Sequence, residues 1–227
     1  MSGVRLAGST GAPAPVLFLD LDDVLCMSSP YGGFAAAAAV NDRHANPQEV
    51  NRQLFQASSV YALKKVHDEM DATIRYVVSS TWREVFNRAQ IEVVFRRAGL
   101  GFVADRLYEG ENWCTPPKFS RSRRVNEIAE WLDRHHQGEP FAIVDDTCSG
   151  ASLSPALALA MRPPPNVPAA RHSRSEAPHP FEGRVTLCQE GVGLTEAHVP
   201  FIVAALQRAV VAPDRTVPAH IESETRQ

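Results

Sequence analysis

Short apolar runs that end in acidic or hydroxyl side chains alternate along this chain with stretches of helical periodicity. The run VLFL at 16–19 has no polar position, which is typical of a parallel strand buried on both faces. The runs TIRYVV at 73–78, FAIV at 141–144 and RVTLC at 184–188 read as further strands. Strands that alternate with helices predict a doubly wound α/β fold, in which helices cover both faces of a mostly parallel sheet.

Apolar residues at helical spacing predict the intervening helices. Val60, Leu63, Val66 and Met70 mark one of them, and Ser58 or Ser59 is its expected cap. Further helices are expected at 85–99, 125–132, 154–161 and within 193–211, where Pro200 either kinks the helix or marks its start. Residues 102–107 are expected to form a short additional strand.

The chain length of 227 residues and a hydrophobic fraction of 44% suit one globular domain. We expect this domain at 15–212, between a flexible N-terminus at 1–14 and a flexible tail at 213–227. The segment 26–58, with its alanine run, is expected to be a flap or a minimal cap. A proline-rich segment at about 162–183 is poor in large apolar residues, so an exposed, disordered insertion is expected there.

Charge and cysteine usage exclude several classes of protein. The net charge of −3 provides no overall basic field for nucleic acid or membranes. The N-terminus lacks the apolar core of a signal peptide, and no run is long enough to span a bilayer. The four cysteines are far apart and form no CxxC motif, which disfavours a disulfide framework or a zinc site. We therefore expect a cytoplasmic protein with no membrane partner.

Polar side chains gather at the carboxyl ends of the predicted strands. They are the pairs Asp20 and Asp22, Ser79 and Ser80, and Asp145 and Asp146. In doubly wound sheets, ligands bind beyond these strand ends, so the three pairs are expected to converge. Carboxylates that meet in one crevice repel one another unless a cation lies among them. Oxygen donors without histidine or cysteine favour Mg²⁺, which also takes water and phosphate oxygens as ligands.

The sequence DLDDVL at 20–25 fits the DxDx(T/V) signature, and on this basis the chain resembles the haloacid dehalogenase (HAD) superfamily. The other elements occur in that superfamily's order: a strand ending in serine, a basic residue before a helix, and a strand ending in two acids. The segments VVSSTWRE, RVNEIAEWL and GVGLT also look like a small branch found in bacterial proteins and RNA-repair polyproteins. The resemblance extends over 15–207, without the proline-rich segment.

The resemblance implies a role for each matching residue. Asp20 would be the nucleophile and a metal ligand, and Asp22 would be the general acid and base, with its backbone carbonyl on the metal. Ser79 would hydrogen-bond the phosphoryl oxygens. Asp145 and Asp146 would complete the metal shell, with Asp146 favoured as the direct ligand.

The basic residue of the resemblance has several candidates in KFSRSRR at 118–124. Lys118 matches the usual residue type, whereas Arg121, Arg123 and Arg124 are the alternatives. These three arginines together are more typical of a solvated face. Ser80, Arg83 and Arg124 are candidate contacts to the substrate, although Arg83 could equally pair with an acid. Trp82 is expected in the core or in the crevice wall.

The resemblance implies a Mg²⁺-dependent phosphomonoester hydrolase that acts through an aspartyl-phosphate. The small flap suggests an open crevice, which favours a nucleotide or polynucleotide phosphate as substrate. The alternative is a catalytically weak binding or effector protein on the same fold. A phospho-receiver module has its acidic pair on the first strand and its phosphoacceptor on a later one, so the order of motifs disfavours it.

Overall fold

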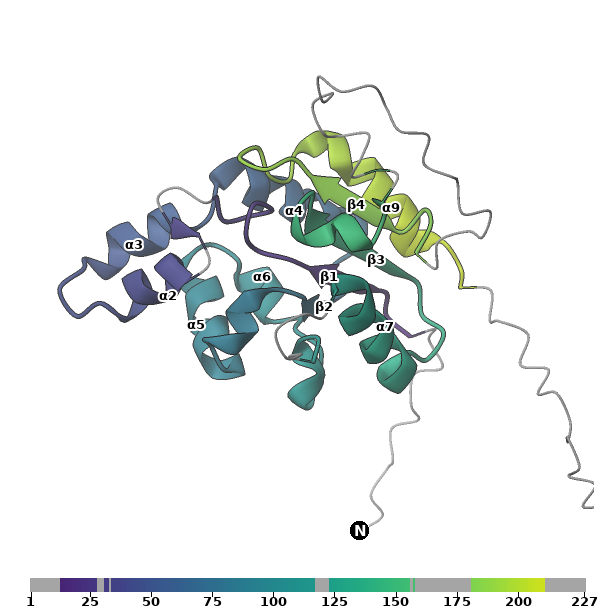
Figure 1. Cartoon of the computed structure of the whole chain (residues 1–227), viewed down its shortest axis with the longest axis horizontal. Helices are drawn as coiled ribbons and strands as arrows, with labels where there is room; N and C mark the ends of the chain where they lie inside the picture. Colours follow the sequence, from purple (N-terminus) through teal and green to yellow (C-terminus); the bar gives the residue numbers. More distant parts are fainter. Residues whose placement is uncertain are drawn as a thin grey trace, which may run out of the picture.

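The centre of the protein is a parallel sheet of four strands. The computed structural model describes residues 13–27, 31–32, 34–116, 123–155, 157 and 181–210. The strands are β1 (Val16–Leu19), β2 (Arg75–Val78), β3 (Phe141–Asp146) and β4 (Val185–Cys188). They lie in the order β2-β1-β3-β4, and each adjacent pair is parallel (Figure 1). This arrangement confirms the predicted α/β fold.

The strand β1 pairs with β2 on one side and with β3 on the other, so its C-terminal end aligns with theirs. Its Leu19 is in register with Val78 of β2 and with Val144 of β3. The pairing continues one step further, because the Asp20 amide donates to the Val144 carbonyl at 3.0 Å and the Ser79 amide donates to the Leu19 carbonyl at 2.8 Å. The side chains that follow Leu19, Val78 and Val144 therefore start from the same edge of the sheet.

Helices cover both faces of the sheet, and β1 alternates between them. Leu17 and Leu19 face a core shared with helices α4 and α9, whereas Val16 and Phe18 face a second core shared with α7 (Figure 1). The α-helices are α2 (Phe34–Asn41), α3 (Pro47–Leu54), α4 (Ala57–Glu69), α5 (Arg88–Arg97), α6 (Gly101–Ala104), α7 (Arg124–His135) and α9 (Val199–Gln207). The 3₁₀ turns are η1 (Thr81–Glu84), η2 (Gly110–Trp113), η3 (Ser149–Ser152) and η4 (Glu196–His198).

The second core is built around Trp131 of α7. Its ring meets Phe18 edge-on at 5.1 Å and Tyr108 at 4.9 Å between ring centroids. Its indole N–H donates to the Asn112 carbonyl at 3.0 Å, so the polar atom of this buried ring is satisfied. This packing fixes α7 across the sheet, with its first residue near the carboxyl ends of the strands.

Two local predictions are wrong. Helix α4 begins at Ala57 without a side-chain cap, and Ser59 lies buried inside it. The Gln56 amide donates to the Leu25 carbonyl at 2.8 Å, and this tertiary bond starts the helix before either serine. The expected strand at 102–107 is not formed, because residues 102–104 belong to the helix α6, whereas Leu107 makes an isolated parallel bridge with Tyr76.

Other helix predictions are confirmed with shifted ends. Helix α5 begins at Arg88 because Asn87 and Gln90 form a reciprocal capping box. Pro200 lies in the first turn of α9, so it marks a start and not a kink. Residues 158–161 and 162–180, which carry the end of the predicted helix after Pro155 and most of the proline-rich segment, lie outside the described residues.

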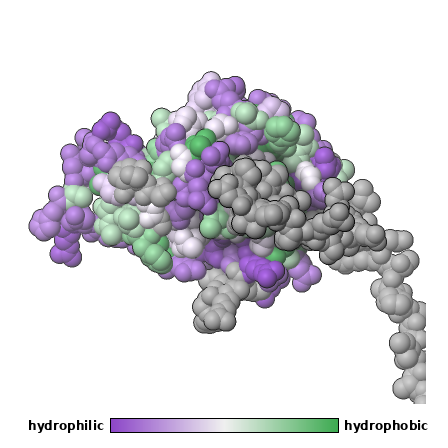
Figure 2. Space-filling view, turned by 45° about the horizontal axis from the view of Figure 1, so that its top comes forward, coloured by the Kyte–Doolittle hydropathy of each residue, from purple (hydrophilic) through white to green (hydrophobic). Residues whose placement is uncertain are grey.

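The segment expected to be a flap contains two helices. α2 and α3 pack against each other and project from the sheet at the left of Figure 1. The outer end of this pair is mostly hydrophilic in the space-filling view (Figure 2). Its function as a flap or minimal cap stays a prediction. Within the described part of the chain, no helix combines the length and apolarity needed to cross a membrane.

The buried pair of His67 and Tyr76 makes the fold sensitive to pH. Nδ1 of His67 lies 3.0 Å from the Tyr76 hydroxyl, and burial, followed by the charge of Lys64, lowers the pKa of His67. The unfolded chain binds a proton there at about pH 6.5. Because the unfolded state binds more protons, the stability that His67 contributes is complete above that pH and is lost as the pH falls.

We therefore predict that His67→Gln reduces the pH dependence of stability. Glutamine can keep a hydrogen bond to Tyr76 but does not titrate. Urea unfolding at pH 7 and pH 5 is expected to show a smaller loss of unfolding free energy for His67→Gln than for the parent. The exposed His44→Gln should keep the parental slope. Equal slopes for His67→Gln and the parent would contradict this interpretation.

Candidate active site

Three aspartates converge where β1 and β3 end. Asp20 comes directly after β1, and Asp145 and Asp146 are the last residues of β3. Their side chains are 2%, 0% and 5% exposed, and one carboxylate oxygen from each lies within 4.8 Å of the others. The in-register pairing of β1 with β3 causes this convergence, since it brings equivalent strand ends to one edge.

Arg124, the first residue of α7, lies in the middle of these acids. Its Nε is 2.9 Å from Asp145 Oδ2, and its Nη2 donates to Asp20 Oδ1 at 3.3 Å. Its Nη1 donates to Glu127 Oε2 at 3.3 Å. The prediction that this arginine belongs to a solvated face is wrong for Arg124, which is only 8% exposed. The packing of α7 over the strand ends, which periodicity cannot reveal, buries it.

Arg83 extends the same ionic network. It donates to Glu127 Oε2 at 2.9 Å and to the Ser80 carbonyl at 2.7 Å, and its side chain is 3% exposed. Of the two predicted alternatives for Arg83, the structure therefore has the pairing with an acid. A chain of charges runs from Arg83 through Glu127 and Arg124 to Asp20.

Negative charge exceeds positive charge in this buried network. Asp20, Asp145, Asp146 and Glu127 are accompanied by the guanidinium groups of Arg124 and Arg83. Burial, reinforced by Asp145, raises the pKa of Asp20 well above its usual range, although Arg124 opposes the shift. Burial likewise raises the pKa of Asp145 to about 6.

These residues fit a magnesium ion. The excess of buried negative charge corresponds to the charge of a divalent cation, and the ligand atoms of the aspartate cluster are all carboxylate oxygens. Without a cation, the repulsion is relieved when a carboxylate takes up a proton. The raised pKa values of Asp20 and Asp145 show that these two groups hold a proton more readily than usual. Asp20, Asp145 and Asp146 are the residues that could hold the ion.

Asp22 lies beside this cluster and is partly exposed. Its Oδ1 accepts from the indole N–H of Trp82 at 3.0 Å, and its Oδ2 accepts from the Thr81 hydroxyl at 3.3 Å. Trp82 itself is buried, as predicted, and its amide donates to the Ser80 hydroxyl at 3.5 Å. Ser80 thus caps the turn η1 that presents both donors to Asp22.

Two buried hydroxyls at the end of β2 have no hydrogen-bond partner among the described residues. One belongs to Ser79 and the other to Thr115. The Thr115 amide donates to the Val78 carbonyl at 3.0 Å, so Thr115 lies beside Ser79 at the same edge of the sheet. Sequence reasoning missed Thr115, because the one-residue bridge of Cys114 to Val78 leaves no strand pattern. Hydroxyls without a partner, at the edge of the sheet where the strands have their C-terminal ends, are suited to donating hydrogen bonds to an anionic oxygen.

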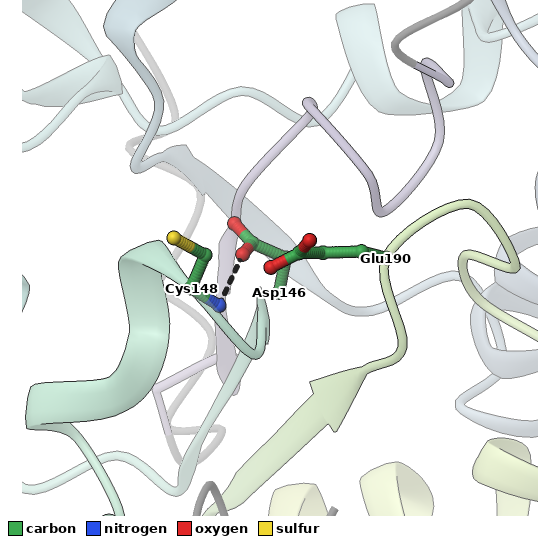
Figure 3. A group of neighbouring side chains, drawn as sticks. All are labelled: Asp146, Cys148 and Glu190. Carbon is green, nitrogen blue, oxygen red and sulfur yellow. Dashed lines mark hydrogen bonds between the residues drawn. The ribbon is translucent and has the colours of Figure 1, made fainter. Parts of the chain in front are cut away.

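A turn after β3 orients Asp146. The amides of Cys148 and Ser149 donate to Asp146 Oδ1 at 2.6 and 3.0 Å, and the Ser149 hydroxyl donates to Asp145 Oδ1 at 2.7 Å. Glu190 extends from the segment after β4 toward Asp146 (Figure 3) and adds a carboxylate that sequence reasoning missed. Gly150 is required in this turn, since a Cβ would lie 2.7 Å from Leu187 and 2.9 Å from Asp145.

The choice of basic residue stays partly open. Lys118, the favoured candidate, and Arg121 lie outside the described residues, and Arg123 is exposed at the start of α7. Among the described cations, Arg124 is the one paired with Asp20. It has the position that the sequence prediction assigned to a basic residue before a helix.

Comparison with known proteins agrees with this arrangement. A family model described as "HAD domain in Swiss Army Knife RNA repair proteins" matches residues 16–199, which include every described residue of the site. No curated protein matches the chain. A search of solved structures found no match either.

Replacing Arg124 tests the charge balance of the network. In the presence of a chelator at pH 7.5, Arg124→Met is expected to lower the free energy of unfolding by about 3–5 kcal/mol, because it leaves buried carboxylates unpaired. Urea unfolding at pH 5.5 should recover part of this loss as the carboxyls take up protons. The exposed Arg134→Met should change stability by less than about 1 kcal/mol. A variant as stable as the parent at both pH values would refute the role of Arg124.

Replacing Thr115 tests the orphaned hydroxyl. Thr115→Val removes a buried hydroxyl without a partner and nearly keeps the side-chain volume, so the free energy of unfolding is expected to rise by about 1 kcal/mol. Urea unfolding measures the change. The matched control is Thr73→Val, whose hydroxyl donates to the Met70 carbonyl at 2.7 Å, and which should lose stability. A loss of stability in Thr115→Val would show that this hydroxyl is satisfied in solution.

Proposed function

The chain belongs to the family of HAD domains in Swiss Army Knife RNA repair proteins, and from this premise we propose that it is a Mg²⁺-dependent phosphatase of phosphorylated nucleic-acid ends. The observation that carries the proposal is the convergence of Asp20 with Asp145 and Asp146 around Arg124. A carboxylate that can act as a nucleophile, acids that can hold a cation and a fixed positive charge are suited to phosphoryl transfer through an aspartate.

In the first step, a carboxylate oxygen of Asp20 attacks phosphorus. The bond from phosphorus to the leaving oxygen breaks with its electron pair on that oxygen, and Asp22 donates a proton to it. In the second step, Asp22 takes a proton from water, and the water oxygen attacks the phosphoryl group. The bond from phosphorus to Asp20 then breaks, which releases inorganic phosphate and restores both side chains.

The surrounding residues support this chemistry by position and charge. The hydrogen bonds from Trp82 and Thr81 hold Asp22 at the partly exposed side of the site, where a leaving group and water can reach it. Arg124 offsets charge on Asp20, and the hydroxyls of Ser79 and Thr115 are suited to phosphoryl oxygens. Asp20, Asp145 and Asp146 would hold Mg²⁺, which supplies the positive charge that lets an anionic phosphate approach a carboxylate.

The proposal of a nucleic-acid substrate rests on the family and on the small flap. The family description names RNA repair proteins. The segment between β1 and α4 contributes two short helices, α2 and α3. An insertion of this size leaves room for a large substrate, such as the end of a polynucleotide.

Release of phosphate from p-nitrophenyl phosphate and from 5′- and 3′-phosphorylated oligonucleotides tests the proposal. We expect turnover with Mg²⁺ and none with a chelator. Asp20→Asn is expected to lower kcat by about a thousandfold or more, because an amide is not a nucleophile for phosphorus.

Asp23→Asn is the matched control for this experiment. It makes the same chemical change three residues away, and asparagine tolerates the positive φ of 52° at that position. A folded Asp20→Asn that hydrolyses as fast as the parent would refute the mechanism. Mg²⁺ binding without any turnover in the parent would favour the catalytically weak binding protein.

A further inference from the structure

A groove lies beside the candidate active site, between α3, the first two turns of α4 and the turn that joins α5 to α6. Its volume is about 820 Å³, which is in the range of sites for small organic ligands. Three aromatic and three basic side chains contribute to its lining: Phe55, Tyr61, Phe102, Arg52, Lys64 and Arg97. The mechanism proposed above uses none of them.

The aromatic side chains offer surfaces for planar groups. The Tyr61 residue is 56% exposed, and the Nζ of Lys65 lies 5.8 Å from the centroid of its ring. Phe102 lies under Lys64, whose Nζ is 5.8 Å from the ring centroid. The amide side chains of Gln48 and Asn51 add donors and acceptors to the same lining. Stacking surfaces next to amides are suited to nucleobases.

The charge of the lining favours an anionic ligand. Arg52, Lys64 and Arg97 line the groove, and the described lining includes no acidic residue. Arg52 pairs with Glu49 at 2.7 Å and Lys64 pairs with Asp68 at 2.7 Å, but both pairs are exposed and are therefore weak enough to exchange for phosphate. Arg97 is exposed and makes no ion pair with another described residue.

The groove and the candidate active site share a wall. Phe55 lines the groove and stacks on Trp82, with 5.6 Å between ring centroids and 29° between planes. The indole N–H of Trp82 donates to Asp22 at 3.0 Å. The Phe55–Trp82 pair therefore links the lining of the groove to the proposed acid.

We propose that the groove binds nucleotides of single-stranded RNA that adjoin the phosphorylated end. This inference rests on the proposed function and specifies its substrate. A base stacks on Tyr61, and backbone phosphates pair with Arg97 and Lys64. The combination of basic and aromatic side chains fits a polyanion with planar bases better than an apolar peptide or a neutral metabolite.

Binding of RNA without a terminal phosphate tests the groove separately from catalysis. The probe is a fluorescein-labelled single-stranded RNA with hydroxyl ends, followed by fluorescence anisotropy on the full chain. Tyr61→Ala and Arg97→Ala are each expected to raise Kd by about tenfold, and Arg97→Ala should also make Kd less dependent on salt. Both side chains are exposed, and thermal unfolding checks that the variants fold.

Two variants elsewhere on the surface are matched controls. Phe201→Ala removes an exposed aromatic ring from α9, and Arg134→Ala removes an exposed arginine from α7. Both should bind RNA like the parent. Unchanged RNA affinity in the groove variants, or an equal loss in the control variants, would overturn the inference. A dimer that Tyr61→Ala dissociates would instead assign the groove to a second copy of the chain and would also overturn it.

Hydrolysis separates the two proposals. The groove variants should keep the parental kcat/KM for p-nitrophenyl phosphate and lose about tenfold for a phosphorylated oligonucleotide. Equal kcat/KM for the oligonucleotide in parent and variants would overturn the groove and leave the phosphatase intact. If the parent shows no turnover but the groove variants still bind RNA more weakly than the parent, the phosphatase proposal is refuted and the groove proposal is supported.

Discussion

Mutual repulsion among buried carboxylates is the constraint on which this structure depends. Asp20, Asp145 and Asp146 lie at one edge of a parallel sheet, where burial makes each charge costly. Arg124 compensates part of that charge through contacts to Asp20 and Asp145. The remainder has to be met by protons or by a cation, and the same arrangement is the site at which we propose phosphoryl transfer.

The scaffold holds the acids in place from several directions. The register of β1 with β3 brings the three aspartates to the same edge of the sheet. The turn after β3 orients Asp146 through the backbone amides of Cys148 and Ser149. Glu127 joins Arg124 to Arg83, so helix α7 and the turn η1 are tied to the same charges. Removal of one member therefore affects elements that are far apart in the sequence.

The strands and the acidic strand ends could be predicted because they depend on local patterns: unbroken apolar runs predict buried strands, and parallel strands bring their terminal residues to one edge. Features that depend on tertiary packing could not. Arg124 resembles its neighbours Arg121 and Arg123 in sequence, and only the placement of α7 buries it. Thr115 follows the isolated bridge between Cys114 and Val78, and residues 102–104 belong to the short helix α6, which ends at Ala104. Lys118 lies in a part of the chain that the structure does not describe.

The bend at Asp23 couples the two rims of the crevice. This residue has a φ of 52°, and its carboxylate accepts the Gly191 amide at 3.1 Å. This hydrogen bond joins the loop that carries Glu190 to the bend that follows Asp22. A displacement of that loop would therefore act on the backbone next to Asp22, the proposed proton donor.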